Sequence, residues 1–228
     1  MRQRIGSVFR YGIATGRCER DMAADLTDAM ASNKPGRYKA LPESELPAFL
    51  KALRDYDGAR YLVIAMRLVL LTGLRTGEVI RARWDEIERE SRIWRIPPER
   101  MKSGLEHLVP LSDAALDLLD ELHPKTKHSQ FLFPGRTYHD KPVSDMALLM
   151  ILRRTGFNKK TTVHGLRSLF SSVANESNLW NPDAIERQLA HVPQNQVRAA
   201  YNRAQYLEER RRLMDWWAEI VAKAEAYE

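Results

Sequence analysis

The pattern of hydrophobic and polar positions predicts helices along most of this chain. Residues 61–71 are apolar on nearly all sides, which is typical of a helix buried in a core. This run stops at Thr72-Gly73, where glycine commonly ends a helix. Other helices are expected over residues 1–31, 43–54, 76–83, 113–122, 143–154, 163–176, 182–189, 194–201 and 207–224.

One region instead favours β-structure. Runs of β-favouring residues occupy positions 84–88, 92–96 and 107–110, and turn residues separate them at Glu90-Ser91 and at Lys102-Ser103-Gly104. Three such runs in succession predict an antiparallel meander. The expected fold class is therefore mainly α with a small three-stranded antiparallel β-sheet (α+β).

The first 31 residues are set apart from the rest of the chain. They carry far more base than acid and are too few to bury a core of their own. A polar segment with Pro35-Gly36 follows, which is typical of a linker. We expect residues 1–31 to be the end of a domain that is otherwise absent, residues 32–40 to be a linker, and residues 41–228 to form one domain with a C-terminal helix over 205–225.

Composition excludes several classes of protein. The 228 residues include one cysteine, so neither a disulfide framework nor a cysteine-based zinc finger is expected. No apolar run reaches the roughly 18 residues that span a bilayer, and the N-terminus lacks the apolar stretch of a signal peptide. We therefore expect a cytoplasmic protein with no membrane partner. The net charge of +6 permits a nucleic-acid partner without requiring one.

The charge is unevenly distributed. No acidic residue occurs from position 146 to 175, although this stretch contains Arg153, Arg154, Lys159, Lys160 and Arg167. A stretch of one sign is expected where a surface faces phosphates. A solvated helix face balanced by acids elsewhere in the fold explains the pattern equally well.

Five short motifs follow one another along the chain. Together and in this order they resemble the tyrosine recombinases, the phage integrase family, and the wording of residues 197–203 looks most like integrases of prophages and genomic islands. The resemblance covers about residues 40–205 in full, and residues 1–31 resemble the end of that family's core-binding domain. No single motif is specific for this family, whereas the five motifs in this order are specific for it. The motifs are Thr72-Gly73-Leu74-Arg75-Thr76-Gly77-Glu78, Met101-Lys102-Ser103-Gly104, His164-Gly165-Leu166-Arg167, Leu189-Ala190-His191 and Ala199-Ala200-Tyr201-Asn202-Arg203.

The resemblance implies a DNA-cutting enzyme that is independent of metal and ATP. Tyr201 would attack the scissile phosphate and form a 3′-phosphotyrosyl link, which conserves the bond energy for rejoining. Arg75 and Arg167 would clamp the non-bridging oxygens, because a guanidinium stays charged and forms bidentate hydrogen bonds. Glu78, at the family's acidic position, would support the site from behind.

Three further groups would complete the chemistry. Lys102, at the tip of a β-turn, would protonate the leaving 5′ oxygen. His164 lies at i, i+3 from Arg167, so both face the same way, and it would accept the tyrosyl proton or bond the phosphate. His191 would donate a hydrogen bond to the phosphate. Arg203 joins Arg153, Arg154, Lys159 and Lys160 as a candidate DNA contact.

Each of these residues also has a structural interpretation. Taken alone, Tyr201 could be a half-buried core side chain, with Tyr206 as the nearest competing tyrosine. A single histidine is often a structural imidazole, and Lys102 could be an exposed turn lysine. Other cations are available at Lys125, Lys127, Lys159 and Lys160.

Neither a metal nor a cofactor is expected. The six histidines offer no His-x-x-x-His or His-Glu-x-x-His spacing, and Cys18 is alone. The chain also lacks the Gly-x-x-x-x-Gly-Lys-Ser/Thr and Gly-x-Gly-x-x-Gly patterns that cradle nucleotides.

The expected function is site-specific DNA recombination that integrates or excises mobile DNA. The implied partners are double-stranded DNA attachment sites, a homotetramer assembled on paired sites from monomers, and an accessory DNA-bending or directionality protein. Two alternatives remain open: an enzyme like a type IB topoisomerase that cuts and reseals without exchange, and a truncated, catalytically silent integrase that only binds DNA.

The last helix has an apolar side at Tyr206, Leu213, Trp217 and Ile220. That side could pack on its own domain or dock on a neighbouring protomer. The run Arg210-Arg211-Arg212 is expected on its other faces.

Overall fold

The computed structural model describes residues 2–26, 39–191 and 205–226. The chain divides into two compact units, Met1–Arg37 and Tyr38–Glu228, and each is described by itself. None of the described helices is long and apolar enough to cross a membrane.

Within its described residues 2–26, the first unit contains one helix, α1 (Arg2–Ala14), followed by turns. The expected helix over residues 1–31 is therefore wrong for positions 15–26. Gly16 explains the early end, because its φ of 68° lies in the left-handed region that glycine adopts without cost. The chain then turns back, and the backbone N–H of Arg17 donates to the carbonyl of Gly12 at 2.7 Å.

The second unit is mainly helical, as predicted, and the fold class is confirmed. A 3₁₀ turn at Glu43–Glu45 leads directly into the first helix of this unit. The helices are α2 (Leu46–Arg54), α3 (Arg60–Thr72), α4 (Thr76–Ile80), α5 (Asp113–Thr126), α6 (Met146–Arg154), α7 (Val163–Glu176), α8 (Pro182–Gln188) and α10 (Leu207–Ala226). The helix predicted over residues 194–201 lies outside the described residues.

Several predicted helix boundaries need correction, and α5 continues to Thr126, beyond the predicted end at residue 122. Helix α4 stops before Arg83, because Arg83 instead pairs with Phe131 in an isolated antiparallel bridge. Helix α6 begins three residues later than predicted, since the N–H of Val143 donates to the carbonyl of Phe133. The C-terminal helix starts at Leu207, as the hydrophobic pattern predicted, and not at 205 as in the domain bounds, because Tyr206 has a φ of 48°.

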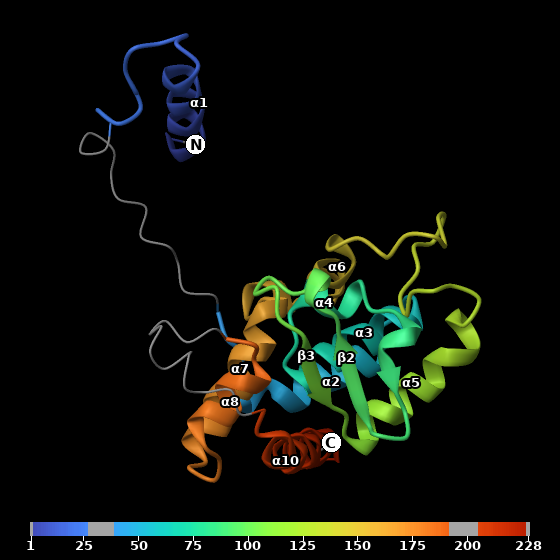
Figure 1. Ribbon diagram of the computed structural model, residues 1–228. Helices are drawn as coiled ribbons and strands as arrows, with labels where there is room; N and C mark the ends of the chain where they lie inside the picture. Colours follow the sequence, from blue (N-terminus) through green and yellow to red (C-terminus); the bar gives the residue numbers. More distant parts are fainter. Residues whose placement is uncertain (1, 27–38, 192–204, 227–228) are drawn as a thin grey trace. The chain divides into compact units, whose positions relative to one another are not determined.

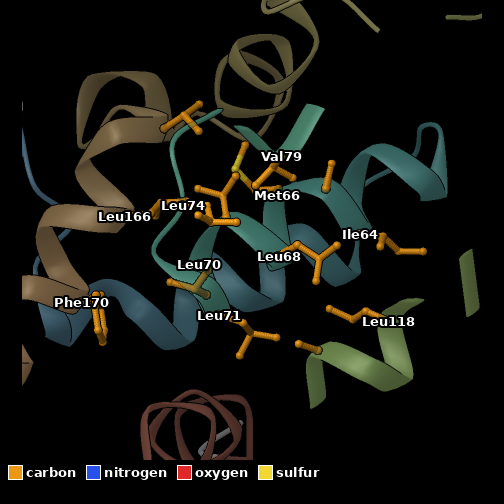
Figure 2. Packing of buried hydrophobic residues seen from close by; sticks show 14 of the residues in the cluster. Ile64, Met66, Leu68, Leu70, Leu71, Leu74, Val79, Leu118, Leu166 and Phe170 are labelled. Carbon is orange, nitrogen blue, oxygen red and sulfur yellow. The ribbon is translucent and has the colours of Figure 1, made fainter. Parts of the chain in front are cut away.

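Helix α3 forms the centre of the core. From Val63 to Thr72 almost every residue is buried, as the all-round apolar pattern predicted. Figure 2 shows Ile64, Leu68 and Leu71 on this helix, with Leu118 of α5 and Phe170 of α7 packed around it. The helix ends at Gly73, whose φ is 66°. A Cβ there would lie 3.0 Å from the Phe170 ring, so the end of α3 and helix α7 approach closely.

The sheet is a meander in the order β1-β2-β3, with antiparallel pairing throughout. Its strands are β1 (Ile87–Glu88), β2 (Ile93–Ile96) and β3 (His107–Pro110), and Ile96 pairs with His107. Residues 84–86, predicted as strand, form a 3₁₀ turn instead. The predicted turn at Lys102 is present, since the N–H of Gly104 donates to the carbonyl of Met101 at 3.0 Å.

Helix α10 packs on its own domain. It contacts α2, α3, α7, α8 and β3, and in Figure 1 it lies below α8 and the sheet. The indole N–H of Trp217 donates to the carbonyl of Leu70 at 2.8 Å, and the Trp217 ring meets Phe170 edge to face. Arg210 corrects the sequence prediction, because it is fully buried among the apolar residues of this helix rather than on another face.

Candidate active site

Arg75 is held at the start of α4 by a single carboxylate. Its Nη1 donates to Glu78 Oε1 at 2.8 Å, and its backbone N–H donates to Glu78 Oε2 at the same distance. The Glu78 side chain is only 5% exposed, whereas that of Arg75 is 32% exposed. Arg100 donates to the backbone carbonyl of Glu78 and fixes it from the other side. The buried Glu78 carboxylate therefore orients the guanidinium of Arg75, and part of that guanidinium remains exposed to solvent.

Arg167 joins the ends of two helices. It projects from the second turn of α7 and is 2% exposed. Its Nη1 donates to the carbonyl of Gly73, after α3, and its Nη2 donates to the carbonyl of Leu189, after α8. Burial, and then the neighbouring charge of Arg75, lowers the pKa of the Arg167 guanidinium to about 10, so it stays charged at neutral pH.

His164 lies one helical turn before Arg167 on the exposed side of α7. Partial burial lowers its pKa, and the positive charges of Arg167 and Arg75 and the imidazole of His191 lower it further. The part of these pKa shifts that comes from charge arises because four basic side chains from three parts of the chain lie near one another. Such a group is suited to an anion, because a bound phosphate would relieve the mutual repulsion.

The glycine between these two residues has a steric role. A Cβ on Gly165 would lie 2.1 Å from the carbonyl oxygen of Lys39 and 2.3 Å from Thr161 Oγ1. Thr161 also donates to the Lys39 carbonyl at 3.1 Å. The N-terminus of α7 is capped by Thr162, whose hydroxyl accepts from the Gly165 N–H at 3.0 Å. These contacts fix the turn from which His164 and Arg167 project.

His191 is oriented by Glu186, which was not predicted as part of the site. Its Nδ1 lies 2.7 Å from Glu186 Oε2, and its backbone N–H donates to the Glu186 carbonyl at 3.0 Å. Ala190, just before it, has a φ of 48°, a conformation that costs a non-glycine residue free energy. Its carbonyl accepts a 3.4 Å hydrogen bond from Arg75 Nη2. A carboxylate on Nδ1 leaves Nε2 of the imidazole available for a ligand.

The other residues predicted for the site lie at the surface or outside the residues that the structure describes. Lys102 is exposed in the turn between β2 and β3, and its ammonium has no hydrogen bond or ion pair among the described residues. Lys160 pairs with Glu45 at 2.7 Å, so an acid elsewhere in the fold offsets its charge. Tyr201 and Arg203 lie outside the described residues. Arg153, Arg154 and Lys159 are exposed.

Residues 39–208 match the model of the phage integrase family, and residues 1–29 match the phage integrase central domain. This chain belongs to the phage integrase family. It is 42% identical over 221 residues to the prophage integrase IntZ of Escherichia coli (strain K12), covering 97% of this chain and 54% of that protein. It is 41% identical over 219 residues to the integrase of Shigella phage Sf6, covering 96% of this chain and 57% of that protein.

The chain thus spans about half the length of the integrases that it matches. Solved structures share its fold. A lambda integrase dimer bound to a core site aligns with a TM-score of 0.61 at 20% identity, covering 83% of this chain and 70% of that chain. The Tn1549 transposon integrase in complex with a circular intermediate DNA gives 0.65 at 16% identity, covering 94% of this chain and 77% of that chain.

Three residues in this integrase fold were not predicted as parts of the site. Glu186 contacts His191, and Gln188 and Arg210 form a buried pair beside the helix ends that Arg167 bridges. Only Glu186 had a signal in the sequence, as an acid five residues before a candidate histidine. Gln188 and Arg210 come from separate helices, so their contact depends on the tertiary fold.

Proposed function

We propose that this chain is the catalytic part of a site-specific DNA recombinase that integrates or excises mobile DNA. One observation carries the proposal: the basic side chains Arg75, Arg167, His164 and His191 lie close enough for charge interactions that lower the pKa of His164 and Arg167, and carboxylates orient Arg75 and His191. Membership of the phage integrase family agrees with this function.

The proposed reaction is an in-line displacement at a scissile phosphate of double-stranded DNA. The Tyr201 oxygen forms a bond to phosphorus as its proton passes to His164 or to solvent. The bond from phosphorus to the 5′ oxygen breaks, and that oxygen takes a proton from Lys102 and leaves as a hydroxyl. A 5′-hydroxyl from the partner strand then attacks the 3′-phosphotyrosyl link and releases Tyr201, so no metal or ATP is consumed.

The described residues act on the charge of the transition state. Arg75, and His191 in its imidazolium form, present donors that are already oriented, so little reorganisation is needed when charge moves onto the non-bridging oxygens. Arg167 is aligned through the carbonyls of Gly73 and Leu189. Glu78 supports Arg75 and does not itself reach the phosphate.

The remaining assignments extend the same proposal. Residues 1–31 belong to a core-binding domain, 32–40 link it to the catalytic domain, and 41–228 form that domain. Four protomers act on two attachment sites in the bacterial cytoplasm, aided by a DNA-bending or directionality protein. One related structure is a lambda integrase tetramer bound to a Holliday junction. Arg153, Arg154, Lys159, Lys160 and Arg203 contact the DNA backbone.

The test uses nicked suicide duplexes with randomised core sequences, on which the released 5′ fragment diffuses away and traps the covalent complex. We expect a protein–DNA adduct, and sequencing the trapped DNA identifies the preferred core. Two such cores are then placed in one plasmid. Exchange between them supports a recombinase, whereas relaxation of supercoils without exchange supports a topoisomerase-like enzyme. DNA binding without any adduct refutes a catalytic role.

A further inference from the structure

A buried ion pair lies directly before the turn that carries Lys102. Arg100, the last residue of a 3₁₀ turn at Pro98–Arg100, donates through Nη1 to Glu86 Oε2. The two side chains are only 15% and 5% exposed. The indole N–H of Trp94, in β2, donates to the same carboxylate oxygen at 3.0 Å. One oxygen of Glu86 therefore joins a strand of the sheet to the connection between β2 and β3.

This pair is not arranged for stability alone. The other oxygen of Glu86 and the Nε of Arg100 are buried, and neither has a hydrogen-bond partner within the residues that the structure describes. A buried ion pair loses the hydration of both ions, and unmet donors and acceptors add to that cost. Apolar side chains of similar volume would fill the same space without this penalty. The benefit of the pair is better sought in what Arg100 holds in place.

The second terminal nitrogen of Arg100 binds the residue that orients Arg75. Nη2 of Arg100 donates to the backbone carbonyl of Glu78, in α4. The side chain of Glu78 accepts from the guanidinium and from the backbone N–H of Arg75. A guanidinium holds its donors in a rigid plane, so its two contacts fix Arg100 relative to both Glu86 and Glu78. The connection between β2 and β3 is thereby fastened to the start of α4.

Lys102 follows this anchor by two residues. The intervening Met101 is buried, at 6% exposed. The N–H of Met101 donates to the Pro98 carbonyl and the N–H of Gly104 to the Met101 carbonyl, both at 3.0 Å. Two residues of extended chain span at most about 7 Å, so the anchor at Arg100 limits the positions open to the backbone of Lys102. The lysine side chain is exposed, and the turn beneath it determines where its ammonium can reach.

We infer that Arg100 is a positioning residue for the proton transfer that accompanies strand cleavage. Bound by Glu86 on one side and by Glu78 on the other, it fixes the turn of Lys102 relative to Arg75. This inference rests on the proposed function, in which the bond from phosphorus to the 5′ oxygen breaks as that oxygen takes a proton from the Lys102 ammonium. Loss of the anchor slows this proton transfer and leaves the grip of the arginines on the phosphate intact.

The test uses two variants of the anchor and a matched control. Arg100→Lys keeps the charge beside Glu86, but one ammonium cannot reproduce the fork that binds both Glu86 and Glu78. Arg100→Met combined with Glu86→Gln removes both charges, so no unpaired charge is left buried. Arg95→Lys is the control, because Arg95 of β2 also bonds two carboxylates, neither of them in α4. Urea unfolding checks that each variant folds, and failure of both anchor variants to fold shows a structural role and overturns the inference.

The first readout is amide hydrogen exchange of residues 101–104 in the free protein, which needs no DNA. We expect about tenfold faster exchange in both anchor variants, because the turn opens more often without the anchor, and parental exchange in Arg95→Lys. Since this readout is independent of catalysis, it stands even if the proposed function fails. Parental exchange in both anchor variants overturns the inference.

The second readout changes the atom that leaves. In a suicide duplex with sulfur in place of the scissile 5′ oxygen, the phosphorus–sulfur bond breaks and the sulfur departs as a thiolate. It needs no proton, because a thiol is far more acidic than an alcohol. Lys102→Ala is the reference and should lose single-turnover cleavage of the oxygen substrate only. We expect Arg100→Lys to lose about 100-fold on the oxygen substrate and less than about twofold on the sulfur substrate.

The remaining outcomes separate the inference from the proposed function. Equal losses on the two substrates in Arg100→Lys show that Arg100 acts on the phosphate through Glu78 and Arg75, which contradicts the inference. Equal losses in Lys102→Ala show that Lys102 is not the proton donor, and the inference fails with that role. A parent that forms no adduct with either substrate refutes the proposed function instead, and the exchange measurement then decides whether Arg100 anchors the turn.

Discussion

Glu78 holds Arg75 with both of its oxygens, one on the guanidinium and one on the backbone N–H of the same residue. The pair forms because a tight turn at Gly73 brings Arg75 to the start of α4, three residues before Glu78. One carboxylate thus sets the position of the backbone and the direction of the side chain together. The arrangement leaves the solvent-exposed part of the Arg75 guanidinium available to bind an anion.

Glu78→Gln should weaken cleavage more than it weakens folding. The amide can accept only one of the two hydrogen bonds and no longer balances the charge of Arg75. We expect a loss of about 1–3 kcal/mol of transition-state stabilisation, measured as single-turnover cleavage at saturating protein. Glu176→Gln, an exposed acid at the end of α7, is the control. Equal cleavage rates for Glu78→Gln and the control would show that Glu78 does not support the active site.

Arg167→Lys should damage both the fold and the reaction. The two terminal nitrogens of Arg167 reach carbonyls that follow different helices, and one ammonium cannot span both. We expect the free energy of unfolding, measured in urea, to fall by about 1–3 kcal/mol and the cleavage rate to fall about 100-fold or more. A lysine variant with parental stability and parental cleavage would show that the bridge between the helix ends is unimportant.

Gly165→Ala should destabilise the domain although alanine is the better helix former. The added methyl group would lie 2.1 Å from a backbone oxygen, that of Lys39, which cannot move aside as a side chain can. We expect a net loss of about 1–3 kcal/mol in urea unfolding, together with slower cleavage because His164 and Arg167 flank the site of the clash. Ser172→Ala, exposed on the same helix, should show neither effect.

Stability should depend on pH through His107. Burial, followed by the charge of Arg210, lowers the pKa of His107 to about 3, against an ordinary value of 6.5. Below pH 6.5 the unfolded chain takes up a proton that the folded chain refuses, so stability falls as the pH falls toward 3. The slope contributed by this one group approaches about 1.4 kcal/mol per pH unit.

Urea unfolding at pH 7 and pH 5 measures this dependence. His107→Gln should lose less stability between the two values than the parent does, by up to about 2 kcal/mol. Parallel losses in the two proteins would show that His107 is protonated in the folded state. His123→Gln, at an exposed position near the end of α5, is the matched control and should follow the parent.

The sequence predicted those parts of the site that depend on neighbours along the chain. Helix α3 was evident because it is apolar on all sides. A spacing of three placed His164 and Arg167 on one side of a helix, and the family resemblance implied that Glu78 supports the site. The contact of His191 with Glu186 was missed, because it requires a left-handed backbone at Ala190, which no side-chain property of alanine signals. Arg210 was placed on the wrong face, since the acceptors that make its burial possible come from β3 and α8.

The most direct measurement of the central claim is the site of attachment of trapped DNA. Protein captured on the suicide duplex is digested, and the peptide that carries the nucleotide is sequenced by mass spectrometry. The account predicts attachment at Tyr201, no adduct in Tyr201→Phe, and an undiminished adduct in Tyr206→Phe. An adduct that persists in Tyr201→Phe, or that maps to Tyr206, would contradict it.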